Sequence, residues 1–209
     1  MTEANADLYV ITAPSGAGKT SLVKALLDKM DRIAVSVSHT TRAMRPGEQE
    51  GVHYHFVDVA EFKAMLSENV FLEYAQVFDN YYGTSAEVVR DMLRQGTDVI
   101  LEIDWQGAEQ VRQLFPECIS VFILPPSKQV LEERLRKRGQ DDESVIAKRL
   151  QGAAEEMQQW HQFDYLIVND DFDVALEALS SLVLAQRHRL VRQKTALAGL
   201  LHDLVAQEI

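Results

Sequence analysis

Residues 13–20, Ala-Pro-Ser-Gly-Ala-Gly-Lys-Thr, have the residue types and spacing of a loop that binds phosphate. They nearly match the pattern G-x-x-x-x-G-K-[ST], but Ala13 stands where the pattern has its first glycine. In such a loop the backbone N–H groups surround one anion, and glycines permit the necessary dihedrals. Lys19 would reach the β- and γ-phosphates of a nucleotide, and the Thr20 hydroxyl would ligate Mg²⁺. The alternative is a glycine-rich turn that ends in a solvated lysine.

The residues on either side favour the phosphate loop over the simple turn. An apolar run at 8–12 precedes it, and 19–30 carries its apolar side chains along one helical stripe. A strand before the loop and a helix after it form the context that the motif requires, because a helix N-terminus attracts anions. Ala13 costs little if its position does not need a positive φ, because residues 15–20 form most of the cradle.

A second candidate lies in the sequence VILEID, where an apolar run at 99–103 ends in acidic residues. Glu102 and Asp104 would then lie at the carboxyl edge of a parallel sheet, where such sheets bind their ligands. Contact with Mg²⁺ through water is the chemistry expected of carboxylates beside a phosphate loop. A strand that simply ends in polar residues is the other interpretation.

These candidates need a framework, and the chain alternates short apolar runs with helical patterns. The runs predict strands buried on both faces at 8–12, 33–37, 99–103, 119–124 and 165–168. The helical patterns lie at 19–30, 107–114, 127–138, 144–160 and 174–184. Alternation of this kind predicts an α/β fold with a five-stranded parallel sheet flanked by helices. Residues 38–83 interrupt the rhythm with β-rich sequence, which indicates a small mixed α/β insertion.

Composition narrows the classes of function. The chain has 209 residues and a formal net charge of −11, which argues against nucleic acid or anionic membranes as partners. Cys118 is the one cysteine, so an internal disulfide and a thiolate metal cluster are excluded. We see no signal peptide and no apolar run long enough to span a membrane. A cytoplasmic protein is the expectation.

Several segments together resemble the bacterial guanylate kinases, from about residue 8 to about residue 184. The most specific are SVSHTTRAMRPGE, EYAQVFDNYYGT, EIDWQG, FILPPS and YLIVNDD. Bacterial members also carry alanine at the place of Ala13. The resemblance implies a P-loop NTPase-type fold with a GMP-binding insertion and a helical lid. It also implies transfer of the ATP γ-phosphate to GMP, or to dGMP, giving ADP and GDP with Mg²⁺ as cofactor, a step in GTP and dGTP supply.

The resemblance also assigns roles to individual residues. It implies that the GMP phosphate is bound by Arg42, Arg45, Tyr54 and Tyr82. It implies that the guanine is bound by Ser38, Glu73, Thr84 and Asp104. ATP falls to Ala13, Pro14, Ser15, Gly16, Ala17, Gly18, Lys19 and Thr20, with Asn169 at the adenine. Thr20 and Asp104 are the implied metal contacts. The implied catalytic residues are Lys19, Arg42, Arg134, Arg138 and Arg149. For any arginine taken singly, solvated surface charge is the competing interpretation.

The resemblance implies a kinase domain at 6–185, and the spacing of the leucines after it predicts a C-terminal amphipathic helix at 186–209. The domain comprises a core (6–37, 84–133 and 151–185), the insertion at 38–83 and a lid at 134–150. The C-terminal helix could dock on the core or form a homo-oligomer, and the sequence leaves both open. His53 and His55 share one strand face, where solvated histidines are commoner than a metal pair.

Two other functions compete with GMP phosphorylation. Some domains of this type have lost catalysis and bind protein partners, but they lack an intact phosphate loop and phosphate clamp. Lys19, Thr20, Arg42 and Arg45 are all present here. A P-loop enzyme acting on another small substrate remains open only if the guanine contacts are misassigned.

Overall fold

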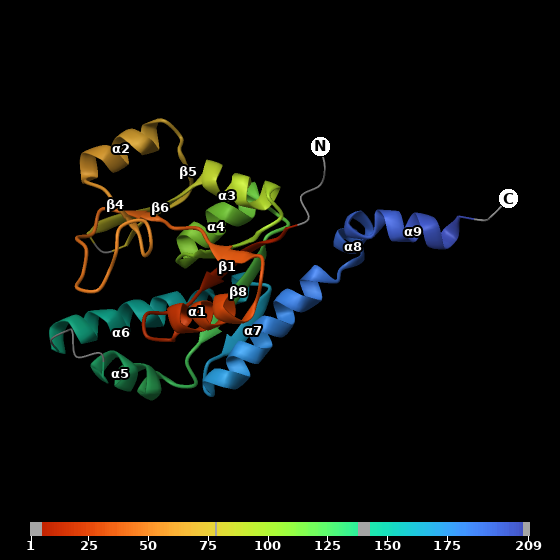
Figure 1. Ribbon diagram of the computed structural model, residues 1–209. Helices are drawn as coiled ribbons and strands as arrows, with labels where there is room; N and C mark the ends of the chain where they lie inside the picture. The colour runs from red at the N-terminus through yellow and green to blue at the C-terminus, as the bar shows by residue number, and fades with distance from the viewer. Residues whose placement is uncertain (1–5, 78, 138–142, 207–209) are drawn as a thin grey trace.

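The chain folds around a five-stranded parallel sheet in a computed structural model that describes residues 6–77, 79–137 and 143–206 (Figure 1). The strand order is β2-β7-β1-β8-β9, and every neighbouring pair is parallel. The strands are β1 Leu8–Thr12, β2 Ile33–Val35, β7 Asp98–Glu102, β8 Ile119–Leu124 and β9 Tyr165–Val168. The predicted α/β fold with a parallel sheet is confirmed.

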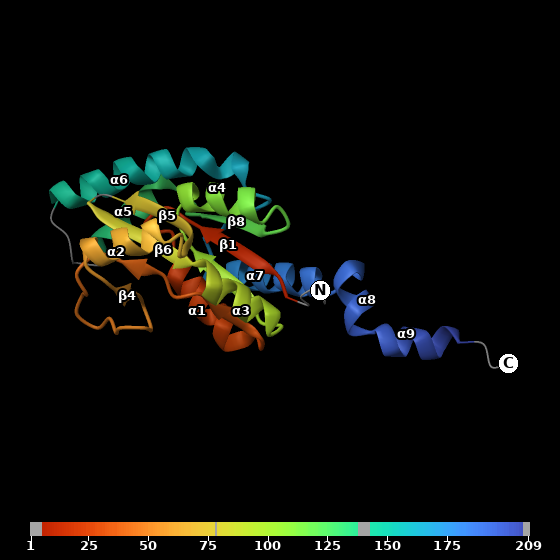
Figure 2. The ribbon, with the colours of Figure 1, turned by 90° about the horizontal axis from the view of Figure 1, so that it is seen from above.

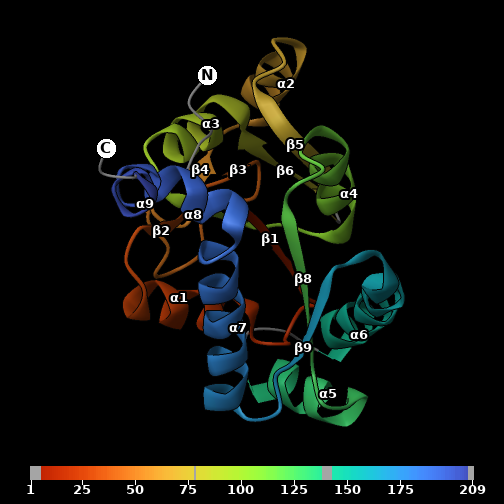
Figure 3. The ribbon, with the colours of Figure 1, turned by 90° about the vertical axis from the view of Figure 1, so that its right-hand side faces the viewer.

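Alternating side chains on β1 explain why helices cover both faces of this sheet. Tyr9 and Ile11 belong to one apolar cluster, together with residues of α1 and α7. Leu8 and Val10 belong to the opposite cluster, with residues of α3 and α4 (Figure 3). The bounds of these helices are α1 Lys19–Lys29, α3 Ala86–Arg94, α4 Trp105–Leu114 and α7 Phe172–Arg187. The sheet is therefore buried on both faces, as is usual for parallel sheets. The phosphate loop and the acidic candidates lie at the carboxyl ends of its strands β1 and β7.

Cys118 belongs to the cluster under α3 and α4 and is 9% exposed. Its burial raises the pKa of the thiol to about 11. The thiol is therefore protonated near neutral pH, and a protonated thiol is a poor nucleophile.

The edge strand β9 departs from the expectation of burial on both faces. Tyr165, Leu166 and Val168 are 40%, 45% and 52% exposed, and Ile167 is buried. The physical reason is its place at the edge of the sheet, where it pairs with β8 on one side. The next residue, Asn169, is buried, with 4% of its surface exposed. Its side chain donates a hydrogen bond to the Ala17 carbonyl of the phosphate loop.

The insertion forms a second sheet of four strands, in the order β4-β3-β6-β5, which lies beside the core in Figure 1. Its strands are β3 His39–Thr40, β4 His55–Phe56, β5 Phe71–Val77 and β6 Asn80–Ser85, and its helix is α2 Val59–Ser67. Phe62 of α2 is fully buried, with ring centroids 4.5 Å from Phe71 and 5.5 Å from Tyr81. Aromatic packing thus holds the helix on its sheet.

Two helices lie where the lid was predicted. α5 (Lys128–Lys137) and α6 (Glu143–Met157) pack together through Leu131, Leu135 and Ala153. A short 3₁₀ helix, Gln158–Gln162, leads from α6 towards β9. Arg138, one of the predicted catalytic residues, lies outside the described residues. The division into core, insertion and lid remains a prediction.

The C-terminal segment differs from the single amphipathic helix expected at 186–209. α7 extends to Arg187, and two short helices follow, α8 Leu190–Ala196 and α9 Ala198–Val205. The two helices meet at Leu197, where the backbone leaves the helical conformation with a ψ of 15°. Both project away from the core (Figure 2). Their leucines are exposed, Leu190 by 78% and Leu204 by 72%. In the part of the chain that the structure describes, no helix is both long and apolar enough to cross a membrane.

A buried carboxylate anchors the start of α8 to the core. Asp98, the first residue of β7, is 0% exposed and accepts hydrogen bonds from the Asp7 N–H at 2.8 Å and from Arg187 Nε at 2.8 Å. Arg192 of α8 contacts the same carboxylate at 2.9 Å and also pairs with Asp7. This network lies at the amino edge of the sheet, away from the phosphate loop at its carboxyl edge.

Candidate active site

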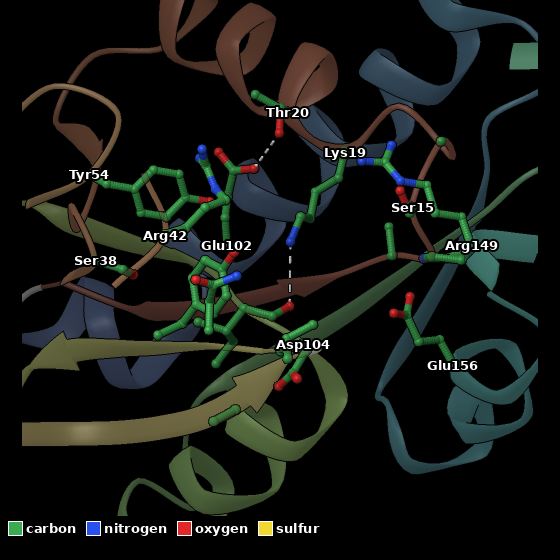
Figure 4. A pocket seen from close by; sticks show the side chains of 18 of the residues that line it. Ser15, Lys19, Thr20, Ser38, Arg42, Tyr54, Glu102, Asp104, Arg149 and Glu156 are labelled. Atoms are coloured by element: carbon green, nitrogen blue, oxygen red, sulfur yellow. Dashed lines mark hydrogen bonds between the residues drawn. The ribbon is translucent and has the colours of Figure 1, made fainter. Parts of the chain in front are cut away.

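A cavity of about 460 Å³ opens at the carboxyl ends of β1 and β7. The phosphate loop, the insertion and α6 each contribute to its wall (Figure 4). This is the edge at which parallel sheets bind ligands, because their strand ends and the following loops converge there.

The phosphate loop has the backbone that its glycines allow. Gly16 and Gly18 both have φ of +94°, and α1 begins directly afterwards at Lys19. Lys19 points into the cavity, and its Nζ donates to the Ile103 carbonyl at 3.4 Å (Figure 4). Among the described residues with a side chain, only Arg32 and Asn69 have a positive φ. Ala13 therefore needs no glycine, as expected from the sequence.

The acidic edge lies next to this loop. Thr20 Oγ1 donates to Glu102 Oε2 at 3.0 Å, and both residues line the cavity. Asp104 lines it too, while its Oδ1 caps α4 by accepting the Gly107 N–H at 2.9 Å. Burial raises the pKa of the Asp104 carboxyl above its ordinary value. Hydroxyl and carboxylate oxygens in one place suit Mg²⁺, so the residues that the sequence nominated fit that ion.

Arg42 of the insertion lines the cavity, and its guanidinium group is hydrogen-bonded to Glu48. Its Nη1 and Nη2 donate to Glu48 at 3.0 and 2.7 Å, and the guanidinium carbon lies 5.4 Å from the centre of the Tyr54 ring. Glu48 itself is not among the residues that line the cavity. The hydrogen bonds from Arg42 lower the pKa of Glu48. Sequence reasoning missed Glu48, whose one signal was its place in the loop after Arg45.

The rest of the predicted phosphate clamp lies in the same wall. Arg45, Tyr54 and Tyr82 all line the cavity, and the two tyrosine rings are 5.9 Å apart, edge to face. Guanidinium groups and phenolic hydroxyls are donors that suit a phosphate. The geometry brings this part of the predicted set together.

A buried carboxylate, which the resemblance assigned to guanine, lines another part of the cavity. Glu73 is 3% exposed and accepts a hydrogen bond from Thr84 Oγ1 at 2.6 Å, and Thr84 Oγ1 lies 3.0 Å from Ser38 Oγ. Burial raises the pKa of Glu73 to about 7. A methyl group at Gly107 would lie 2.5 Å from Glu73 Oε2, so the glycine leaves room for the carboxylate. Sequence reasoning missed Gly107, because helix α4 brings it to Glu73 only in the folded chain.

Helix α6 closes the cavity on the side of the loop (Figure 4). Arg149 and Glu156 lie seven residues apart, about two turns, so both point from one helix face into the cavity. Burial raises the pKa of Glu156 to about 7, while the positive charge of Lys19 and the Ser15 N–H oppose that rise. Glu156 was also missed, because a helix rich in glutamates offers no signal for the one that faces inward.

His53 and His55, for which the sequence favoured solvated side chains over a metal pair, make separate hydrogen bonds. The His53 ring accepts a hydrogen bond from the Gln49 N–H at 3.1 Å, and His55 lies 3.1 Å from Glu50. Within the described ranges, no group of three or more His, Cys, Asp or Glu side chains could hold a metal ion. His55 belongs to β4, where its ring contacts the ring of His39, whereas His53 lies in the turn before that strand and does not share its face.

The family model described as guanylate kinase matches residues 5–186. The chain belongs to the guanylate kinase family. It is 59% identical over 198 residues to the guanylate kinase of Methylococcus capsulatus, covering 95% of this chain and 97% of that protein. The same identity holds over 199 residues with the guanylate kinase of Saccharophagus degradans, again 95% and 97% covered. The crystal structure of guanylate kinase from Anaplasma phagocytophilum is 32% identical with a TM-score of 0.80, and covers 100% of both chains.

Some residues that the sequence nominated for this guanylate kinase lie behind the cavity wall. Thr84 is fully buried and reaches the site through Glu73. Ala17, Arg134 and Asn169 are likewise absent from the cavity lining. Arg134 Nη2 donates to the Asn169 carbonyl at 3.0 Å, and the Asn169 amide donates to the Ala17 carbonyl at 2.7 Å. Direct contact of these residues with ATP remains a prediction.

Proposed function

We propose that the phosphate loop binds ATP, that the insertion binds GMP, and that the γ-phosphoryl group passes between them in the cavity. Membership of the family makes the chain a guanylate kinase, an ATP:GMP phosphotransferase. One observation supports the assignment of roles. A single cavity is lined by Lys19 of the loop, Arg42 and Glu73 of the insertion, and Arg149 of α6.

The residues in this cavity suit phosphoryl transfer because that reaction depends mainly on positioning and charge. Lys19 and the loop N–H groups would hold the β- and γ-phosphates of ATP. Arg42 and Arg45, with the hydroxyls of Tyr54 and Tyr82, would orient the GMP phosphate so that one of its oxygens faces the γ-phosphorus. Arg149 would neutralise negative charge on the transferred group. Thr20 and Asp104 would hold Mg²⁺, which when bound would offset the negative charge of the ATP phosphates.

Glu73 would select guanine over adenine. Guanine presents its N1–H and 2-amino group side by side, and one carboxylate accepts both. Adenine has an unprotonated N1 and no 2-amino group, so a buried carboxylate opposite adenine would lose its donors. The Ser38 and Thr84 hydroxyls belong to the same hydrogen-bonded group as Glu73. Deoxy-GMP carries the same base and is therefore an expected second substrate.

The test is an ADP-release assay with ATP, Mg²⁺ and a panel of GMP, dGMP, IMP and AMP. We expect Lys19→Ala to lower kcat at least about a hundredfold, because one transition-state charge contact is worth several kcal/mol. Its melting temperature should stay near that of the wild type. A Lys19→Ala enzyme with normal kcat would remove the loop from the mechanism.

The same assay tests the guanine site with Glu73→Gln. We expect kcat/KM for GMP to fall sharply while the KM for ATP hardly changes, because the substitution is confined to the other substrate. IMP keeps N1–H but lacks the amine, so it separates the two hydrogen bonds. If GMP turnover and the preference over AMP both survive, Glu73 does not select the base.

Homo-oligomer formation and the cytoplasmic location remain predictions.

A further inference from the structure

Asn169 lies directly after β9, and its backbone is fixed on both sides. Its N–H donates to the Leu124 carbonyl at 2.8 Å, and its own carbonyl accepts from Arg134 Nη2 at 3.0 Å. The residue is 4% exposed. The side chain therefore starts from an immobilised point, and its direction is set by the sheet and by α5.

The amide of this side chain holds one peptide group of the phosphate loop. Asn169 Nδ2 donates to the Ala17 carbonyl at 2.7 Å, in a buried hydrogen bond. The described chain contains no cis peptide bond. In a trans peptide the C=O and the following N–H point in opposite directions. When the amide fixes the Ala17 carbonyl on one side, the Gly18 N–H is directed to the other.

The cavity lies on that other side. Gly18 lines it, whereas Ala17 is 0% exposed and does not. Gly18 also allows the close approach of the amide, since a Cβ on this residue would lie 2.3 Å from Asn169 Nδ2. The glycine therefore serves two needs, a φ of +94° and space for the asparagine.

We propose that Asn169 is a positioning residue that orients the Ala17–Gly18 peptide so that the Gly18 N–H faces the phosphates of ATP. The proposal rests on the proposed role of residues 13–20 as the ATP phosphate site. It differs from the role that the resemblance suggested, a contact with adenine. A donor held in place before the ligand arrives costs no reorganisation when the ligand binds, so the amide would act on affinity and rate without touching ATP.

The test compares Asn169→Ala and Asn169→Asp with the wild type. Aspartate keeps the shape but replaces the donor with an acceptor that opposes the Ala17 carbonyl. The measurements are the KM for ATP, the KM for GMP, the melting temperature, and inhibition by inorganic tripolyphosphate. Tripolyphosphate carries the phosphates of ATP without adenine. We expect ATP and tripolyphosphate both to bind about tenfold more weakly in Asn169→Ala, since a buried carbonyl loses its donor. Asn169→Asp should lose more.

Three results would overturn the proposal. Loss of ATP affinity with unchanged tripolyphosphate inhibition would indicate an adenine contact. Equal losses for ATP, tripolyphosphate and GMP, with a lower melting temperature, would indicate a structural role. Unchanged binding of both ligands in both variants would show that the Ala17–Gly18 peptide needs no support.

Ser120→Ala is the matched control, because it removes a side-chain hydrogen bond of another buried residue in the same two strands, at their amino ends and away from the phosphate loop. Ser120 Oγ donates to Asp164 at 2.6 Å, and Ser120 is 0% exposed. It should lower stability without changing tripolyphosphate inhibition.

If both Asn169 variants fail to fold while Ser120→Ala folds, Asn169 is needed for folding and the proposal is wrong. If Lys19→Ala leaves tripolyphosphate inhibition intact, the proposed phosphate site itself fails. If Lys19→Ala abolishes it and Asn169→Ala does not, this inference alone fails.

Discussion

Two buried carboxylates, one in each sheet of the molecule, have different surroundings. Asp98, at the amino edge of the core sheet, is 0% exposed and contacts two guanidinium groups and a backbone N–H. Glu73, in the wall of the cavity, is 3% exposed and accepts a hydrogen bond from the Thr84 hydroxyl. The charge of Asp104 further disfavours ionisation of Glu73, whose pKa rises to about 7 mainly through burial.

The difference separates a carboxylate that stabilises the fold from one suited to a ligand. A buried charge is tolerated when it is paired and hydrogen-bonded, as Asp98 is by Arg187, Arg192 and the Asp7 N–H. Glu73 lines the cavity and has no guanidinium partner among its contacts in the described chain, and in our proposal guanine supplies further donors. Substitution at Asp98 should therefore change stability, and substitution near Glu73 should change GMP binding.

The largest effect is expected from Asp98→Ala. The substitution leaves the guanidinium groups of Arg187 and Arg192 without their shared partner, and both side chains are largely buried, 17% and 12% exposed. We expect the free energy of unfolding to fall by about 3–5 kcal/mol, as when one partner of a buried ion pair is removed. Denaturant unfolding measures this change, and kcat at a temperature where the variant is folded should stay near normal.

Asp91→Ala is the control for this first prediction. Asp91 pairs with Arg94 on the surface of α3, where the side chains are 47% and 70% exposed. Exposed pairs contribute at most about 1 kcal/mol, so this variant should unfold nearly like the wild type. Equal losses in the two variants would contradict the structural role given to Asp98.

A smaller effect is expected when pH titrates Glu73. With a pKa of about 7, its carboxyl is increasingly protonated below neutrality and can no longer accept both guanine donors. We expect kcat/KM for GMP to fall about tenfold for each pH unit below 7, as for loss of one essential ionised group. Burial also raises the pKa of Glu156 to about 7, so Glu73→Gln is the necessary control. If its profile between pH 5 and 7 matches that of the wild type, another group causes the dependence.

The raised pKa has an opposite consequence for folding. The Glu73 carboxyl binds its proton more tightly in the folded chain than at its ordinary value of 4.5. Its contribution to stability is therefore full below about 4.5 and is lost as pH rises through about 7. Over this window Glu73→Gln should lose less stability with rising pH than the wild type, and thermal unfolding at several pH values measures the difference.

The smallest change is one methyl group, Gly107→Ala. The added carbon would lie 2.5 Å from Glu73 Oε2, so the carboxylate must move. We expect the KM for GMP to rise about tenfold, because displacing a binding group impairs the productive geometry. Alanine is a better helix former than glycine, so stability should not suffer from the propensity of α4. A variant that loses stability but keeps its KM would mean that the helix, and not Glu73, absorbs the methyl group.

Much of the fold was predictable because it depends on local patterns. β1, β8 and β9 begin and end where their apolar runs do. The sequence also indicated the inserted second sheet through its change of composition. It did not reveal that β9 lies at an edge, since strand order depends on contacts between distant segments. At 186–209, leucine periodicity predicted one helix. The helix is interrupted at Leu197, and the leucines of both short helices are exposed.

The candidate site was predictable where a motif carries the chemistry in consecutive residues, as in the phosphate loop. The family resemblance nominated Arg42, Glu73 and Arg149, and the structure brings all three to one cavity. Glu48, Gly107 and Glu156 were missed. Glu48 contacts Arg42 only through the fold of its loop, Gly107 lies against Glu73 of another element, and Glu156 lies on the face of α6 that turns inward. Their residue types are common, so only the folded chain separates them from surface residues.

Cys118 has a practical consequence for spectroscopy. The chain has no other thiol, and this one is 9% exposed with a pKa of about 11. Maleimide and methanethiosulfonate reagents react with thiolates, so the folded protein should take up almost no label at neutral pH. A cysteine introduced on α2 or on the outer face of α6 would then carry a fluorophore or spin label alone, without a cysteine-free background having to be built first.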